Sequence, residues 1–90
     1  MQAGSPRQLT RSERTVDKTR RGGLPAPFTG KTWVGPGTSK ECSGCSEPIA
    51  PEEREYEVEI SDALTLQLHA ECHQAWITFD GAADHYPAAG

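Results

Sequence analysis

Two pairs of potential metal ligands with the same internal spacing stand out in this chain of 90 residues. Cys42-Ser-Gly-Cys45 and His69-Ala-Glu-Cys72 each place two donors three positions apart, and together they contain every cysteine of the chain. A short loop or one turn of helix can aim two donors at this spacing toward a single ion. Thiolate and imidazole donors in a closed set of four suit tetrahedral zinc better than a hard, oxygen-preferring cation. The pattern therefore predicts one structural zinc ion on Cys42, Cys45, His69 and Cys72, with no vacant position for a substrate.

The fourth ligand has an alternative, because His73 directly follows Cys72. On a helix, His73 would point about 100° away from Cys72, whereas His69 lies nearly one turn earlier and can face the same ion. His69 is therefore the preferred ligand and His73 the alternative. Two other interpretations stay open: three unrelated buried thiols, or iron in place of zinc.

The composition indicates a domain that needs a metal. Only 34% of the residues are hydrophobic, which is low for a chain that must fold by burial alone. Domains of fewer than about 70–80 residues commonly add a structural metal to a small core. We therefore expect the metal-free chain to be largely unfolded. With no apolar leader, no apolar run of about 20 residues and an odd number of cysteines, the sequence predicts a cytoplasmic protein.

The elements that must position the ligands can be located by their patterns. Residues 55–60 and 64–68 alternate apolar and polar side chains, and Ser61-Asp62-Ala63 between them supplies turn chemistry, so a β-hairpin is expected. An apolar stripe at helical spacing predicts a helix over residues 70–79 that carries Cys72 in its first turn. In the Cys42–Cys45 knuckle, Gly44 is expected to adopt a positive φ and leave backbone N–H groups pointing at sulfur.

A knuckle with two ligands, then a hairpin, then a helix with two more ligands resembles a treble-clef zinc finger. The spacing also resembles the first zinc half of a LIM domain, over about residues 40–79, and the chain is similar in outline to short bacterial proteins of unassigned function. No second set of four ligands follows Cys72, so the tandem LIM unit is absent. The resemblance implies a small α+β zinc-binding domain at residues 40–80, in which Cys42, Cys45, His69 and Cys72 bind the ion.

The flanking segments differ from this module. Residues 1–23 contain few large apolar side chains and predict a basic, disordered leader. Residues 24–39 are rich in proline and glycine and predict an extended arm, whose Phe28 and Trp33 are expected to cap the core. Residues 81–90 are expected to form a flexible tail.

Charge is divided unevenly along the chain. Residues 1–40 have a net charge of +6 and residues 41–90 have a net charge of −10. A basic leader can bind nucleic acid, a protein partner or the acidic half of its own chain. The cations that could contact phosphates are Arg7, Arg11, Arg14, Lys18, Arg20 and Arg21.

The sequence favours a binding module over an enzyme. A thioredoxin-like interpretation of Cys42 and Cys45 lacks the necessary βαβ context and leaves His69 and Cys72 unexplained. A deaminase interpretation of His69-Ala-Glu71 has its motifs in the wrong order. We therefore predict a protein-interaction or adaptor module, with nucleic-acid binding through the leader as the alternative, and neither a small-molecule substrate nor a membrane as partner.

Overall fold

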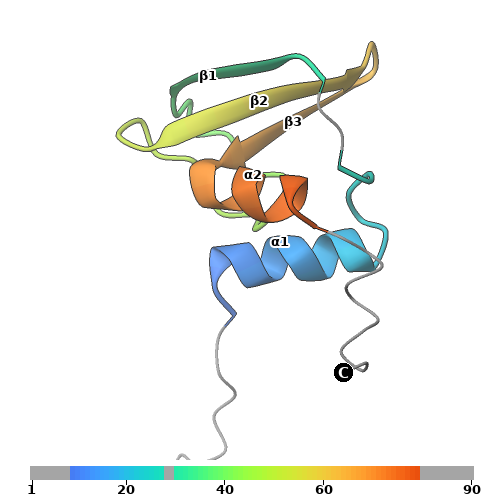
Figure 1. Ribbon diagram of the computed structural model, residues 1–90. Helices are drawn as coiled ribbons and strands as arrows, with labels where there is room; N and C mark the ends of the chain where they lie inside the picture. The colour runs from blue at the N-terminus through green and yellow to red at the C-terminus, as the bar shows by residue number, and fades with distance from the viewer. Residues whose placement is uncertain (1–8, 28–29, 80–90) are drawn as a thin grey trace, which may run out of the picture.

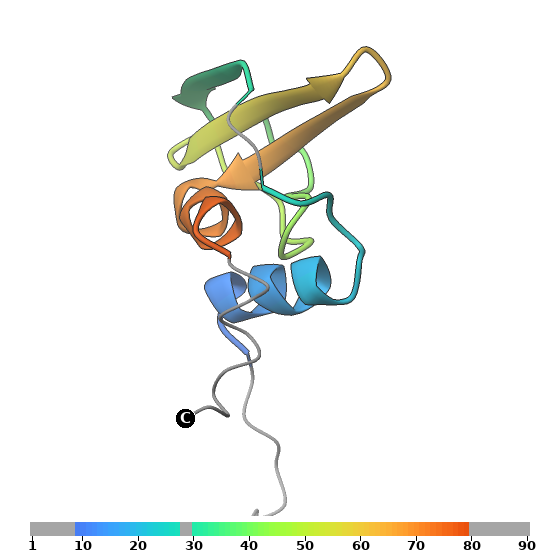
Figure 2. The same ribbon diagram turned by 45° about the vertical axis from the view of Figure 1, so that its right-hand side comes forward.

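The computed structural model describes residues 9–27 and 30–79, which form a small α+β domain with three layers. A three-stranded antiparallel sheet in the order β1-β2-β3 lies at one side, α2 packs beneath it, and α1 packs beneath α2 (Figures 1 and 2). The elements are α1 Arg11–Arg20, β1 Thr32–Pro36, β2 Arg54–Ser61, β3 Leu64–His69 and α2 Ala70–Ile77. No helix in this described part is long and apolar enough to cross a membrane.

The expected hairpin is confirmed as β2 and β3. Val58 pairs with Leu66 and Tyr56 pairs with Leu68, so their side chains share the face that packs on α2. Val58, Leu66 and Leu68 are buried, which explains why the alternating pattern was readable from the sequence. A register shift between Glu59 and Ser61 interrupts the pairing next to the turn.

The predicted helix is confirmed as α2, although it ends at Ile77 rather than residue 79. Its Cys72 and Trp76 are fully buried between the sheet and the rest of the core. The Trp76 indole Nε1–H donates to the Pro25 carbonyl at 2.8 Å, and neighbouring Leu24 joins the core. The segment that follows α1 is thereby fastened to α2.

The extended arm predicted over residues 24–39 contains a strand. β1 pairs with β2, with Trp33 opposite Glu57 and Val34 opposite Tyr56. The expectation that Trp33 caps the core is wrong, because its side chain is 53% exposed. Its position opposite Glu57 places it on the face of the sheet that points away from α2. Phe28 lies outside the described residues.

The disordered leader predicted over residues 1–23 is wrong for residues 11–20, which form α1. Thr10 begins the helix with a capping box, in which its hydroxyl accepts from the Glu13 N–H and the Glu13 carboxylate accepts from the Thr10 N–H. α1 lacks an apolar face of the usual width and buries Thr15 and Thr19 instead. Residues 1–8 and the predicted tail at 81–90 lie outside the described part of the chain.

Candidate metal centre

The structure brings Cys42, Cys45, His69 and Cys72 together at one buried point. The three Sγ atoms and one imidazole nitrogen all lie within 4.8 Å of one another, and all four residues are buried. They come from three places in the fold: the loop before β2, the last residue of β3 and the first turn of α2. These four residues could hold one metal ion.

The two cysteines of the loop are held by a tight turn. The Cys42 N–H donates to the Glu47 carbonyl at 2.9 Å, and the Ser46 N–H donates to the Cys42 carbonyl at 3.0 Å. As the sequence predicted, a backbone N–H points at sulfur, since the Gly44 N–H lies 3.3 Å from Cys42 Sγ. The positive φ predicted for Gly44 is instead found at Ser46, with φ of 72°.

Gly44 is required for a different reason, namely its close approach to α1. A Cβ atom at this position would lie 2.3 Å from the Thr15 Oγ1 and 3.0 Å from the Thr15 Cγ2. Thr15 is fully buried and its hydroxyl donates to the Arg11 carbonyl at 3.0 Å. The backbone of the knuckle at Gly44 therefore packs directly against the Thr15 side chain of α1, and no space remains for a methyl group.

His69 is oriented by contacts on both sides of its ring. Nδ1 lies 3.4 Å from Cys45 Sγ and 3.8 Å from Cys72 Sγ. On the other side, Nε2 lies 3.2 Å from the Pro48 carbonyl oxygen and 3.4 Å from Glu53 Oε1. Because a carbonyl oxygen only accepts, Nε2 carries the proton, and the lone pair of Nδ1 faces the three sulfurs.

A charged chain of contacts extends from His69 to α1. Arg11 Nη1 donates to Glu53 Oε2 at 2.8 Å, and the Ala50 N–H donates to Glu53 Oε1 at 2.9 Å. The bond from Arg11, and then that from Ala50, holds the pKa of the Glu53 carboxyl below its usual range. Glu53 is thus an ionised carboxylate beside the imidazole N–H, an arrangement that fixes the ring and strengthens its basicity toward a metal.

We predict that Glu53→Gln weakens zinc binding about 10-fold, because the neutral amide is a poorer acceptor for His69 and a poorer partner for Arg11. Competition with a chromophoric chelator would measure the affinity. Glu52→Gln is the matched control, since Glu52 is the adjacent, exposed carboxylate. Equal zinc affinities for the two variants would contradict a role of Glu53 in holding the ring.

His73 lies apart from the four donors. Its ring stacks on Tyr56 with centroids 4.4 Å apart and an interplanar angle of 15°. Burial lowers the pKa of His73, which favours the neutral ring in this stack. The alternative fourth ligand is therefore directed at the sheet, while His69 is directed at the sulfurs.

The three thiols are electrostatically unequal. A hydrogen bond donated by the Cys72 thiol lowers the pKa of Cys42 to about 4. That bond and burial raise the pKa of Cys72, and burial is also the main cause of the raised pKa of Cys45. Three thiolates this close together would repel one another, and this repulsion opposes the loss of all three protons. A divalent cation among the sulfurs would remove this repulsion, so the donor set fits a soft divalent metal.

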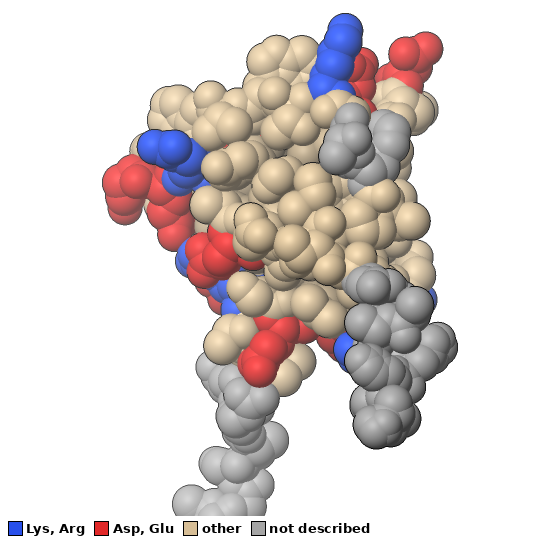
Figure 3. All heavy atoms as spheres, in the orientation of Figure 1, with Lys and Arg blue, Asp and Glu red and all other residues tan. Residues whose placement is uncertain are grey.

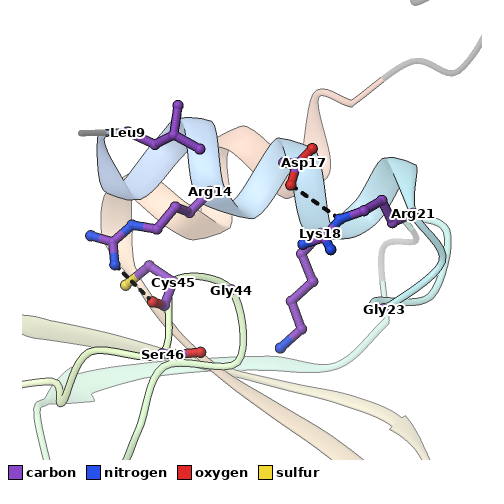
Figure 4. Close-up of a pocket in the computed structure, with 9 residues that line it drawn as sticks. All are labelled: Leu9, Arg14, Asp17, Lys18, Arg21, Gly23, Gly44, Cys45 and Ser46. Carbon is purple, nitrogen blue, oxygen red and sulfur yellow. Dashed lines mark hydrogen bonds and ion pairs between the residues drawn. The ribbon is translucent and has the colours of Figure 1, made fainter. Parts of the chain in front are cut away.

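Helix α1 lies over the knuckle and satisfies its carbonyl groups. Arg14 Nη1 donates to the Cys45 carbonyl at 3.2 Å, and Lys18 Nζ donates to the Ser43 carbonyl at 2.7 Å. Figure 4 shows both side chains extending from the helix toward the loop, beside a hollow of about 520 Å³. Three thiolates with one bound divalent ion would have a net charge of −1, which these two cations would complement.

Besides the Arg11–Glu53 pair, two ion pairs to Glu47 hold the N-terminal half of α1 against the loop. Arg11 Nε lies 2.9 Å from Glu47 Oε1, and Arg14 forms an ion pair with the same carboxylate. The hydrogen bonds from Arg14 and then Arg11 lower the pKa of the Glu47 carboxyl. Of the alternatives for the basic segment, docking onto the acidic half of its own chain is the one that these contacts realise.

The cations predicted to contact nucleic acid are thus largely engaged within the protein. Arg11, Arg14 and Lys18 bind the loop, while Arg21 Nε lies 3.1 Å and Arg20 Nη1 lies 3.9 Å from Asp17. Arg7 lies outside the described residues. Sequence reasoning missed α1 as part of the site, although Thr10 and Glu13 at capping-box spacing were a readable signal of it.

Four donors from the protein would be enough to complete a tetrahedral shell around one zinc ion. Comparison of this chain with family models, curated proteins and solved structures gave no match.

Proposed function

We propose that this chain is a structural zinc module that acts as a protein-interaction or adaptor domain. The observation that carries the proposal is the buried cluster of one imidazole and three sulfurs, with its supporting carboxylate and carbonyl on His69. Such a donor set favours zinc among biological divalent ions. The order of knuckle, hairpin and helix supports assigning the module to the treble-clef, LIM-like type.

Zinc would act by linkage between binding and folding. The ligands lie on three separate elements, so the ion joins parts of the chain that are up to 30 positions apart. The unfolded chain cannot present these four donors together, and the free energy of zinc binding therefore becomes free energy of folding. The function of the metal is to hold a surface in shape, and the recognition is done by that surface.

Metal content tests the zinc assignment. We predict one zinc per chain in protein purified without added metal, and loss of that zinc in Cys72→Ser and His69→Asn. His73→Asn is the matched control, because His73 stacks on Tyr56 and should leave the zinc content unchanged. Elemental analysis of the four proteins would measure this. Absence of metal from a folded wild-type protein would contradict the proposal and leave three free thiols to be explained.

Two observations support a protein partner. The face that carries α2 is largely uncharged at its centre, with charged side chains toward its periphery (Figure 3). Trp33 and Val34, on neighbouring positions of β1, are 53% and 50% exposed. Extended uncharged surface and exposed aromatic or aliphatic side chains are each typical of protein-binding sites.

The nucleic-acid alternative has a direct test. Because Arg11, Arg14 and Lys18 bind the loop, we predict that the zinc-loaded protein binds random-sequence DNA and RNA weakly, even at about 50 mM salt. Fluorescence anisotropy at about 50 and about 200 mM salt would measure this. Tight binding that falls steeply with salt would instead favour the nucleic-acid function.

A further inference from the structure

The outer edge of β1 presents unused backbone hydrogen-bonding groups. The Glu59 N–H donates to the Lys31 carbonyl and the Gly37 N–H donates to the Glu53 carbonyl, both across the β1–β2 pair. In an antiparallel pair, residues alternate between facing the neighbouring strand and facing away from it. The backbone groups of Thr32 and Val34 therefore point away from β2, toward the open side of the sheet.

The other edge of the sheet is covered at the middle of β3. The Ser43 N–H donates to the Gln67 carbonyl at 2.7 Å, and the Gln67 N–H donates to the Ser43 Oγ at 3.1 Å. The metal-binding loop thus closes β3 at its middle. In Figure 1, β1 lies at the edge of the sheet farthest from α1, where no other described segment is seen alongside its outer side.

The side chains around this open edge have two different characters. On the face that packs on α2, exposed Val34 neighbours Tyr56, its partner on β2. On the opposite face, exposed Trp33 neighbours Glu57, which forms no ion pair with any described residue. One side of the edge is therefore apolar, and the other combines an aromatic ring with a carboxylate.

Further carboxylates make the Trp33 side acidic. Glu59 lies next along β2 on the same face, again with no ion-pair partner in the described part of the chain, although Lys31 lies opposite it on β1. Glu55, on the other side of Glu57, accepts from the N–H and hydroxyl of Thr38 and is buried. Glu57 is the carboxylate nearest to Trp33 in the register of the sheet, and its charge is available to a ligand.

We propose that the β1 edge binds an extended, basic segment of a partner protein as a fourth strand. Its backbone would pair with Thr32 and Val34. Its alternate side chains would be Lys or Arg toward Trp33 and Glu57, and apolar toward Val34 and Tyr56. This inference rests on the proposed protein-interaction function and names the class of partner.

A second copy of this chain is a less suitable occupant of the edge. Two β1 strands paired across a two-fold axis at Val34 would bring the acidic faces of the two sheets side by side, including Glu57 of each copy. The chain also has a formal net charge of −4, so self-association would have to overcome repulsion. A basic strand meets the same edge with complementary charge.

The probe for this site is a short synthetic peptide of alternating lysine and valine, added to the zinc-loaded full chain and followed by NMR. We expect the largest amide shifts at Thr32 and Val34, and new protection of their N–H groups from exchange. A glutamate–valine peptide should bind at least about 10-fold more weakly. A lysine–valine peptide that is N-methylated on alternate amides should not bind detectably, because it cannot continue the hydrogen-bond ladder.

Variants separate the side-chain and backbone contributions to this binding. Trp33→Ala and Glu57→Gln should each weaken binding about 5- to 10-fold, and Val34→Pro should abolish it by removing an outward N–H. Leu64→Ala, which changes an exposed residue at the hairpin turn, is the control and should bind like wild type. The proposal would be overturned if the Trp33 and Val34 variants bound the peptide like wild type. It would also be overturned if the amide shifts were confined to α2 or the knuckle, or if the folded wild-type protein did not bind. A dimer of the wild type that Val34→Pro converts to a monomer would also overturn it, by assigning the edge to a second copy.

Crosslinking distinguishes a wrong assignment of the β1 edge from a wrong assignment of the protein-interaction function. If crosslinking in a cell lysate captures the same protein with wild type and with the Trp33→Ala, Val34→Pro double variant, the interaction function stands and the β1 assignment falls. If wild type captures no protein, the proposed function itself falls. Loss of capture in the double variant, with zinc content unchanged and the captured segment basic, is the result that we expect.

Discussion

Removing zinc from the folded protein is expected to abolish the hairpin, α2 and the attachment of α1 in one transition. The proposed ligands belong to the loop, β3 and α2, and α1 is held by hydrogen bonds to that same loop and by packing on α2. Zinc binding free energies of the order of 10 kcal/mol at neutral pH exceed what a small core supplies. Far-UV circular dichroism should show loss of secondary structure on addition of a strong chelator, with loss of the near-UV signal of buried Trp76.

Re-addition of metal is the control for this experiment. One equivalent of zinc should restore both signals, whereas magnesium should not, because it prefers oxygen ligands in octahedral geometry. The His73→Asn protein should respond like wild type. A metal-free chain that still unfolds cooperatively on heating would show that the core, and not the ion, specifies the fold.

The cluster of candidate ligands and the hairpin could be predicted because their signals are local in sequence. Cys42 and Cys45, and likewise His69 and Cys72, are three positions apart, so each pair is readable without knowledge of the fold. Tyr56, Val58 and Ile60 alternate with glutamates for a similar reason, since one face of β2 packs on the core. The stripe of Cys72 and Trp76 indicated α2 in the same way.

The position of α1 could not be predicted from such signals, because the contacts that hold it are distant in sequence. Arg11 binds Glu47 and Glu53, which are 36 and 42 positions away. A pattern of apolar residues does not reveal this helix, because α1 buries threonines and is attached through charged side chains. The unequal charge of the two halves of the chain was the only long-range indication, and it was compatible with several partners.

Trp33 shows a second limit of sequence reasoning. A tryptophan near a small core is usually buried, but whether it faces the core depends on the register of its strand. Here Trp33 pairs opposite Glu57 and its neighbour Val34 pairs opposite Tyr56, so the larger of the two side chains points away from α2. A shift of one residue would have exchanged the two faces.

Gly44→Ala is expected to detach α1 while zinc stays bound. The new methyl group would meet the Thr15 Oγ1 at 2.3 Å, Cγ2 at 3.0 Å and Cβ at 3.1 Å. Thr15 is β-branched and fully buried, so its side chain has few other rotamers available. Overpacking of this kind costs about 1–3 kcal/mol, which is large beside the contribution of the partly exposed ion pairs of Arg11 and Arg14 that help to hold the helix. Trypsin should then cleave after Arg14 and Lys18, and mass spectrometry would detect the fragments.

Two further variants show whether the clash with Thr15 is the cause. Gly35→Ala is the matched control, because a Cβ at Gly35 would meet no atom within 4 Å, and it should resist trypsin like wild type. Thr15→Ala in the Gly44→Ala background removes the Oγ1 and Cγ2 atoms and should restore much of the resistance, a non-additive effect diagnostic of direct contact. If α1 of the Gly44→Ala protein resisted trypsin like wild type, the close approach of α1 to the knuckle would not be needed to hold the helix in place. Cleavage in α1 with zinc content unchanged would establish α1 as a separable cover on a self-sufficient metal centre.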